Sequence, residues 1–143
     1  MTVIVDTGVL YADHDRDSPR HAAAHTALEA VYDGEFGQPS LSDYIFDEAV
    51  TLTRTRANSV SPALALSEKL RGVGSYPDVY DLVHVTPAVF ADVVELFEAY
   101  DDQGLSFTDA TTVAVCERHG IDSVMSFDDD FDGVFERVDP ETI

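Results

Sequence analysis

Short apolar runs alternate along this chain with longer stretches of helical periodicity, and that alternation restricts the folds it can adopt. The runs are rich in Val, Leu and Phe and too short for helices, so they predict buried strands. They cover Val3–Val5, Leu82–Val85, Ser123–Phe127 and Val134–Val138. Strands separated by helices predict an α/β fold with a mostly parallel central sheet and helices on both of its faces. Ligands of such sheets bind beyond the carboxyl ends of the strands.

The helices are predicted from their start and stop residues. Three of them start with Ser or Thr followed by Pro, which favours the first turn of a helix. Ser106 with Asp109 resembles a capping box, and Gly120 is a typical helix stop. The predicted helices run from Ser18-Pro19 to Tyr32, from Ser42 or Asp43 to Ala57, from Ser61-Pro62 to Leu70, from Thr86-Pro87 to Tyr100 and from Phe107 to His119. An Asp-rich loop is expected after Asp6.

An acidic residue stands at each of four landmarks in this pattern. Asp6 and Asp128 end two apolar runs, Glu48 lies within a predicted helix, and Asp109 lies in the first turn of another. Two carboxylates about 4 Å apart repel by roughly 4 kcal/mol at an effective dielectric constant of about 20, so a fold that gathers four needs compensating positive charge. A bound Mg²⁺ or Mn²⁺ supplies that charge through oxygen ligands. The pattern therefore predicts phosphodiester hydrolysis by metal-activated water.

Other polar residues are candidates to support this site. Thr7, Ser126 and Asp130 are close in sequence to Asp6 or Asp128, and they could hydrogen-bond a carboxylate or orient it. Arginine side chains are expected to contact the phosphates of a nucleic acid. The candidates are Arg16, Arg20, Arg54 and Arg56, and for each of them an ordinary solvated surface position is the competing interpretation.

The chain is strongly acidic, with a net charge of −20 from 28 Asp and Glu against 8 Lys and Arg. Such a balance opposes nucleic-acid binding in dilute buffer. In molar salt the Debye length falls to about 3 Å, so the self-repulsion of an acidic surface is screened. We interpret the charge as halophilic adaptation to a salt-filled cytoplasm. An ordinary acidic protein that avoids nucleic acid is the alternative.

Length and apolar content limit the organisation of the chain. A length of 143 residues predicts a single domain over residues 1–143. The start, MTVIVDTG, has no basic residue, and no stretch approaches the roughly 18 apolar residues of a membrane span. A cytoplasmic protein that does not bind membranes is expected. The one cysteine, Cys116, excludes an internal disulfide and is expected to be a buried thiol.

Four segments carry the acids. VIVDTGVLYA holds Asp6, SDYIFDEAVTL holds Glu48, GLSFTDATTVAVCERHG holds Asp109, and SVMSFDDDFDGV holds Asp128. In this order and spacing they resemble the motifs of PIN domains, and most closely those of the VapC ribonuclease toxins of bacterial and archaeal toxin–antitoxin pairs. The resemblance extends over nearly the whole chain.

This resemblance implies a three-layer α/β/α PIN-like fold in which the four acids are the catalytic and metal-binding residues. It also implies Mg²⁺ or Mn²⁺ as the cofactor, endoribonuclease activity on RNA such as tRNA or rRNA, homodimerisation and inhibition by a cognate VapB-like antitoxin. The function that it favours is the toxin of a VapBC-type pair. A PIN nuclease of rRNA processing stays open as an alternative.

Calcium binding is an alternative from another class. Asp128, Asp130, Asp132 and Gly133 reproduce the front half of an EF-hand loop, and Asp139 falls where its last ligand would be. An EF-hand needs a helix on either side, whereas a strand is predicted before this segment. The context therefore argues against an EF-hand.

Two further alternatives concern partners and zinc. A PIN-like protein without catalysis would serve only to bind a partner, and the apolar faces of the helices between Tyr44 and Leu70 could pair two subunits or bind an antitoxin. His21 and His25 are spaced for a zinc pair on one helix, but no third ligand is evident, and both are expected to face solvent.

The halophilic interpretation predicts that KCl stabilises the protein. We expect the midpoint of thermal unfolding, measured by circular dichroism, to rise between about 0.1 M and 1 M KCl because the surface carboxylates repel one another less when screened. A midpoint that stays constant over this range would contradict the interpretation.

Overall fold

The computed structural model describes residues 1–143 and contains a five-stranded sheet in the order β3-β2-β1-β4-β5. The strands are β1 (Thr2–Val5), β2 (Gln38–Ser42), β3 (Asp81–Val83), β4 (Ser123–Met125) and β5 (Arg137–Val138). Every neighbouring pair is parallel. In β1, Ile4 lies between Ser40 of β2 and Val124 of β4. Val3–Val5 is fully buried, as expected for a strand covered on both faces.

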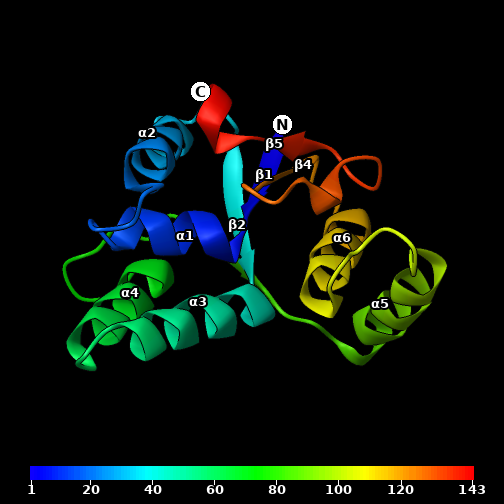
Figure 1. Ribbon diagram of the computed structural model, residues 1–143, viewed down its shortest axis with the longest axis horizontal. Coiled ribbons are helices and arrows are strands. Elements are labelled where there is room, and N and C mark those ends of the chain that lie inside the picture. The colour runs from blue at the N-terminus through cyan, green and yellow to red at the C-terminus, as the bar shows by residue number, and fades with distance from the viewer.

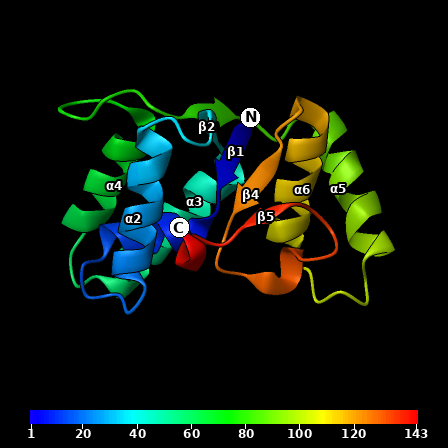
Figure 2. The same ribbon diagram turned by 90° about the horizontal axis from the view of Figure 1, so that it is seen from above.

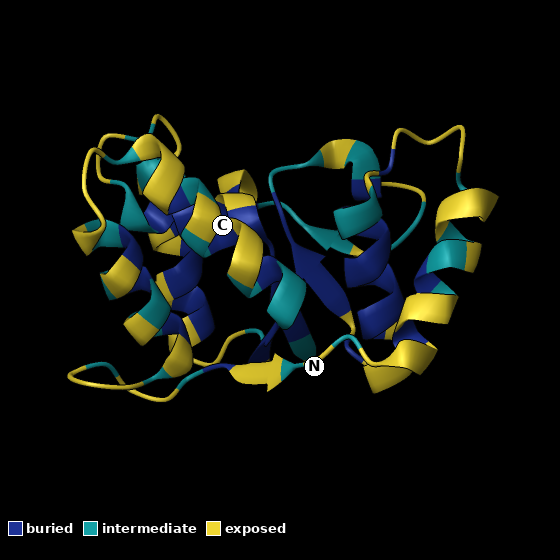
Figure 3. Cartoon of the chain, turned by 90° about the horizontal axis from the view of Figure 1, so that it is seen from below, coloured by how far each residue is buried: buried dark blue, intermediate teal, exposed yellow.

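Six helices cover the sheet in two layers. They are α1 (Thr7–His14), α2 (His21–Tyr32), α3 (Asp43–Arg56), α4 (Ser61–Arg71), α5 (Pro87–Ala99) and α6 (Phe107–His119). Figure 1 and Figure 2 show α1 to α4 on one side of the sheet and α5 and α6 on the other. α6 lies between the sheet and α5, and most of it is buried, whereas the outer face of α5 is exposed (Figure 3). The predicted three-layer α/β/α architecture is confirmed.

Side-chain caps begin three of the predicted helices. Ser42 Oγ accepts a hydrogen bond from Ile45 N at 3.1 Å at the start of α3, and Thr86 caps α5 in the same way. At the start of α6, Ser106 Oγ accepts from Asp109 N at 3.0 Å, and Asp109 Oδ2 accepts from Ser106 N at 3.4 Å. The capping box predicted for α6 is confirmed, and so are the bounds of this helix.

Two elements differ from the sequence-based predictions. α1 begins directly after Asp6, where an Asp-rich loop is expected, because the Asp6 side chain caps the helix and Val9 and Leu10 are buried. β2 is not predicted at all. It contains Pro39 and polar residues instead of an apolar run, and its place between β1 and β3 depends on strand pairing rather than on local sequence.

Several predicted boundaries shift by a few residues. α2 begins at His21 without a side-chain cap, so Ser18-Pro19 belongs to the preceding turn. α4 begins at Ser61, as predicted, and ends at Arg71, one residue later than predicted. The last two strands are shorter than predicted, and β4 ends at Met125 because the chain then turns away from the sheet. The last one or two residues of a helix or strand depend on tertiary contacts, which the local sequence pattern does not encode.

A partly buried ion pair joins α1 to α4, and both histidines of α2 bind groups of α1. Lys69 Nζ donates to Asp13 Oδ2 at 2.9 Å, and His25 Nδ1 lies 2.9 Å from Asp13 Oδ1. His21 Nδ1 donates to Ala12 O at 2.9 Å and is half-buried, so the expectation that it faces solvent is wrong. Both Nδ1 atoms bind groups of α1, and neither histidine belongs to a group of three or more possible metal ligands.

Two further expectations can be compared with the structure. Cys116 is fully buried, and burial raises the pKa of its thiol to about 12, which confirms a buried thiol that stays protonated at neutral pH. None of the helices combines the length and the apolar composition that crossing a membrane requires.

Phe131 anchors the short 3₁₀ helix η1 (Asp129–Phe131) to the core, where its side chain is fully buried. We expect Phe131→Ala to lower the free energy of unfolding by about 3–5 kcal/mol, because it removes a large ring from a close-packed site. Phe97→Ala is the control, since this ring on α5 is 40% exposed and packs against Phe107, and its loss should cost clearly less, about 1–2 kcal/mol. Urea denaturation measures both; equal losses would contradict the burial of Phe131.

Candidate metal centre

The carboxyl edge of the sheet opens into an acidic cleft. Val5 of β1 pairs with Met125 of β4, and Asp6 N donates to Met125 O at 3.0 Å, so the residues that follow the two strands emerge side by side. The start of α6 and one turn of α3 complete the cleft, whose volume is about 660 Å³. Its acidic lining consists of Asp6, Glu48, Asp109, Asp128, Asp129 and Asp130.

Asp6 is held at the floor of this cleft by two hydrogen bonds. Its Oδ1 accepts from Thr7 N at 2.9 Å, and its Oδ2 accepts from Ser126 Oγ at 2.6 Å. The residue is only 9% exposed. Burial raises the pKa of the Asp6 carboxyl above its ordinary value, the two hydrogen bonds oppose this rise, and the negative charge of Glu48 adds to it. Asp6 is therefore a fixed acid that prefers a compensating cation.

Asp109 is held by the capping box of α6 and is 8% exposed. Burial raises the pKa of its carboxyl to about 6, and repulsion from Asp6 and Asp128 contributes to the rise. The bonds to Ser106 act in the opposite direction. The Asp109 carboxylate therefore both caps α6 and lines the cleft. The neighbouring acids increase the free-energy cost of keeping it charged.

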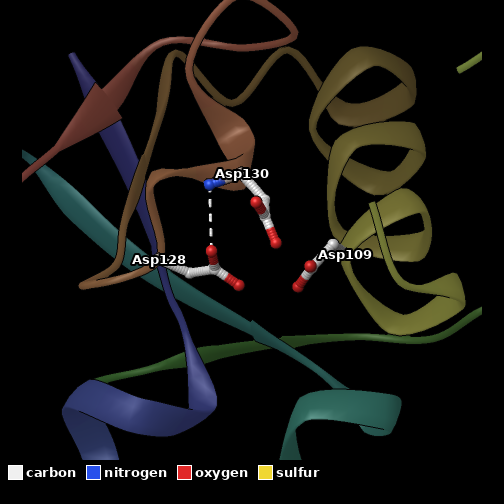
Figure 4. A group of neighbouring side chains, drawn as sticks. All are labelled: Asp109, Asp128 and Asp130. Carbon is white, nitrogen blue, oxygen red and sulfur yellow. Dashed lines mark hydrogen bonds between the residues drawn. The ribbon is translucent and has the colours of Figure 1, made fainter. Parts of the chain in front are cut away.

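Asp128 and Asp130 approach Asp109 from the segment that follows β4. Asp128 N donates to Ser126 Oγ at 3.0 Å, and Asp130 N donates to Asp128 Oδ1 at 2.9 Å. Carboxylate oxygens of the three aspartates lie within 4.8 Å of one another, with the side chains directed toward a common point (Figure 4). The charge of Asp128 is the main reason why the pKa of Asp130 is raised.

The four acids singled out in the sequence all line this one cleft. The tightest group, however, is Asp109, Asp128 and Asp130, whereas Asp6 and the exposed Glu48 lie outside it. Sequence reasoning named Asp130 only as a supporting residue, because local spacing does not show which member of an acidic run turns inward. The role of each acid as a metal ligand stays a prediction.

Of the four candidate arginines, only Arg20 lines the acidic cleft. Arg16 and Arg56 line a separate depression, where the guanidinium carbon of Arg56 lies 4.9 Å from the centre of the Tyr11 ring. Arg54 is exposed on α3 and lines neither depression. The structure thus separates four residues that the sequence could not distinguish.

The EF-hand alternative is wrong. Strand β4, not a helix, precedes Asp128, and Arg137 binds both carboxylate oxygens of Asp132, at 2.8 and 3.0 Å. Asp139 also lies beside Arg137, with 3.7 Å between Oδ2 and Nη1. Two of the acids needed for an EF-hand loop are therefore ion-paired with an arginine instead of converging.

The lining of the cleft fits a hard divalent cation. Its donors are carboxylate and hydroxyl oxygens, which Mg²⁺ and Mn²⁺ prefer, and no sulfur or imidazole nitrogen lines it. Thr7 Oγ1 is buried at the edge of this group and has no hydrogen-bond partner. An unpaired buried hydroxyl costs about 1–3 kcal/mol, so a water or other oxygen ligand held by a cation in the cleft would give Thr7 Oγ1 a partner, while the cation itself would offset the repulsion between the acids.

Comparison with known proteins agrees with this geometry. A family model described as PIN domain matches residues 3–136. No curated protein matches the chain significantly. VapC20 of Mycobacterium tuberculosis, a sarcin-ricin loop cleaving toxin, is similar with 27% identity and a TM-score of 0.76, over 90% of this chain and 92% of that one.

Two further structures share the fold at lower identity. A toxin–antitoxin complex from Klebsiella pneumoniae has 20% identity and a TM-score of 0.67, over 96% of this chain and 97% of that one. VapBC2 from Rickettsia felis, bound to a DNA fragment from its promoter, has 8% identity and a TM-score of 0.71, over 96% and 98%. These two comparisons support the architecture alone.

The raised pKa of Asp109 predicts how its replacement affects stability. A carboxyl whose pKa is higher in the folded than in the unfolded chain favours folding only while protonated, so its contribution is present below about pH 4 and is lost as pH rises through about 6. We expect Asp109→Asn to stabilise the metal-free protein at pH 7 by about 1–2 kcal/mol, allowing for solvent screening and the altered cap. Urea denaturation in EDTA at pH 4.5 and pH 7 measures this; a larger gain at pH 4.5 would contradict it.

Proposed function

Because this chain belongs to the PIN domain family, we propose that it is a Mg²⁺- or Mn²⁺-dependent endoribonuclease and the toxin of a VapBC-type toxin–antitoxin pair. The observation that carries the proposal is the gathering of Asp6, Glu48, Asp109, Asp128 and Asp130 in one cleft at the carboxyl edge of the sheet. Acids at this density oppose folding unless a cation occupies the cleft. Chemistry that needs the cation explains why the chain places these acids together.

The residues of the chain prepare the cleft for hydrolysis of a phosphodiester. A divalent cation, when bound, supplies activation of water and neutralisation of phosphate charge. Asp109, Asp128 and Asp130 would hold it, with Asp6 and Glu48 beside them. Ser126 orients both Asp6 and the Asp128 backbone, so the acids are in place before the substrate arrives.

The substrate and partner classes follow from the relatives. VapC20 of Mycobacterium tuberculosis cleaves a sarcin-ricin loop, which supports a structured RNA, rRNA or tRNA, as the substrate of this chain. The Klebsiella pneumoniae structure is a toxin–antitoxin complex, which supports a VapB-like antitoxin as its partner. The exposed Val60 (49%) and Leu64 (56%) at the start of α4 support a protein-binding surface, for the antitoxin or for a second copy in a homodimer. We place this activity in a salt-filled cytoplasm, where the acidic surface is screened.

Incubation of the purified protein with total RNA in molar KCl tests the proposal. We expect cleavage with Mg²⁺ or Mn²⁺ and none in EDTA, with discrete cut ends on mapping. Asp6→Asn and Asp109→Asn should each reduce cleavage by roughly a hundredfold or more, because each removes a charge from the cluster that holds the cation.

Asp33→Asn is the matched control, since Asp33 is an exposed acid at the end of α2 and does not line the cleft. It should cleave RNA at the wild-type rate. Circular dichroism spectra of all variants should match that of the wild type. Full activity in both cleft variants would refute the assignment of these acids, and wild-type protein that cleaves no RNA with either cation would refute the function.

A further inference from the structure

Arg20 is the single basic side chain that lines the acidic cleft. Its backbone is fixed at the start of α2, where Arg20 N donates to Ser18 Oγ at 3.3 Å and Arg20 O accepts from Ala24 N at 3.0 Å. The guanidinium carbon lies 4.7 Å from the centre of the Phe127 ring, so the charged group covers the ring face. The Arg20 side chain therefore has a defined position, although the residue is exposed to solvent.

The guanidinium of Arg20 is unpaired in spite of its acidic surroundings. It takes part in none of the ion pairs of the structure and donates no hydrogen bond, whereas Lys69, Arg118 and Arg137 all bind carboxylates. The guanidinium of Arg20 therefore contacts the face of the Phe127 ring and no carboxylate. This leaves the N–H donors of Arg20 free for a ligand.

Phe127 is a rigid support for this cation. It lies between Ser126 and Asp128, whose side chains form hydrogen bonds within the site, and it packs against the hydrophobic core. Of the nearby carboxylates, Asp6 and Asp128 accept bonds from backbone N–H groups or from Ser126. The ring of Phe127, on the same segment as Asp128, is the group that the guanidinium contacts instead of a carboxylate.

We propose that Arg20 binds a phosphate of the RNA backbone in the cleft, and that Phe127 is the positioning residue that holds its guanidinium there. The inference rests on the proposed ribonuclease function. The planar guanidinium can donate two parallel hydrogen bonds to the non-bridging oxygens of one phosphate, which a lysine cannot match. Every other charged group of the lining repels RNA, so this cation determines where the backbone enters.

Cleavage kinetics of a mapped RNA substrate test the proposal. Arg20→Ala should lower kcat/KM by roughly ten- to a hundredfold, the usual loss for a hydrogen bond between charged groups. Arg20→Lys should recover only part of this loss because the two-point contact is missing. Phe127→Leu should give a smaller loss, about threefold to tenfold, because the guanidinium loses its ring support and turns toward the acids.

Arg71→Ala is the matched control. Arg71 is an exposed arginine near the end of α4, bonds only to Ser67 and lies outside the cleft, so this change removes the same charge elsewhere. Its kcat/KM should stay within about twofold of the wild type. Thermal midpoints of the Arg20 variants should lie within a few degrees of that of the wild type, because the side chain is exposed and its one contact is with the face of the Phe127 ring.

RNA binding measured against salt separates a phosphate contact from a structural role. In the Asp109→Asn background, whose cleavage should be slower by roughly a hundredfold or more, Arg20→Ala should reduce the slope of log affinity against log KCl concentration by about 0.7, the value for one phosphate contact on a single strand. An unchanged slope with unchanged kcat/KM, in protein whose parent cleaves RNA, would overturn the Arg20 inference alone. Equal losses in Arg20→Ala and Arg71→Ala would overturn it as well. Complete rescue by Arg20→Lys would overturn the two-point contact with phosphate, and wild-type kcat/KM in Phe127→Leu would overturn the role of Phe127. If the parent protein cleaves no RNA with either cation, both the proposed ribonuclease function and the Arg20 inference are refuted.

Discussion

Repulsion between carboxylates in one partly closed cleft is the constraint on which the site depends. The fold opposes it with hydrogen bonds from neutral groups: Ser126 and the Thr7 backbone hold Asp6, and Ser106 holds Asp109. These bonds orient the acids without neutralising them, so the pKa values of Asp6 and Asp109 stay raised. Hydrogen bonds from neutral groups therefore fix the directions of the carboxylates but do not remove the repulsion between them.

Local chemistry explains which parts of the fold could be predicted from the sequence. The bounds of α6 follow from Ser106, Asp109 and Gly120, which act within one helix. The strand Val3–Val5 follows from its apolar run. β2 could not be predicted, because Pro39 and its polar neighbours become a strand only through pairing with β1 and β3. α1 could not be predicted, because the acidic residues at its end favour a loop. One of them, Asp13, is instead buried and paired with Lys69.

The candidate site was predictable in its location but not in its detail. Acids at the carboxyl ends of parallel strands converge for topological reasons, and this places Asp6 and Asp128 together. No local pattern shows that Asp130 turns toward Asp109 or that Arg137 binds Asp132. The contact of Arg20 with Phe127 joins distant parts of the chain, so it is visible only in the folded protein.

The pairing of β1 with β4 has a consequence for synthesis on the ribosome. β1 is made first, but Ser126, which orients Asp6, follows a strand that emerges after all six helices. Non-local strand pairing of this kind comes late in folding. A nascent chain therefore carries Asp6, Glu48 and Asp109 without their final arrangement, and the cleft is complete only after β4 has left the exit tunnel of the ribosome.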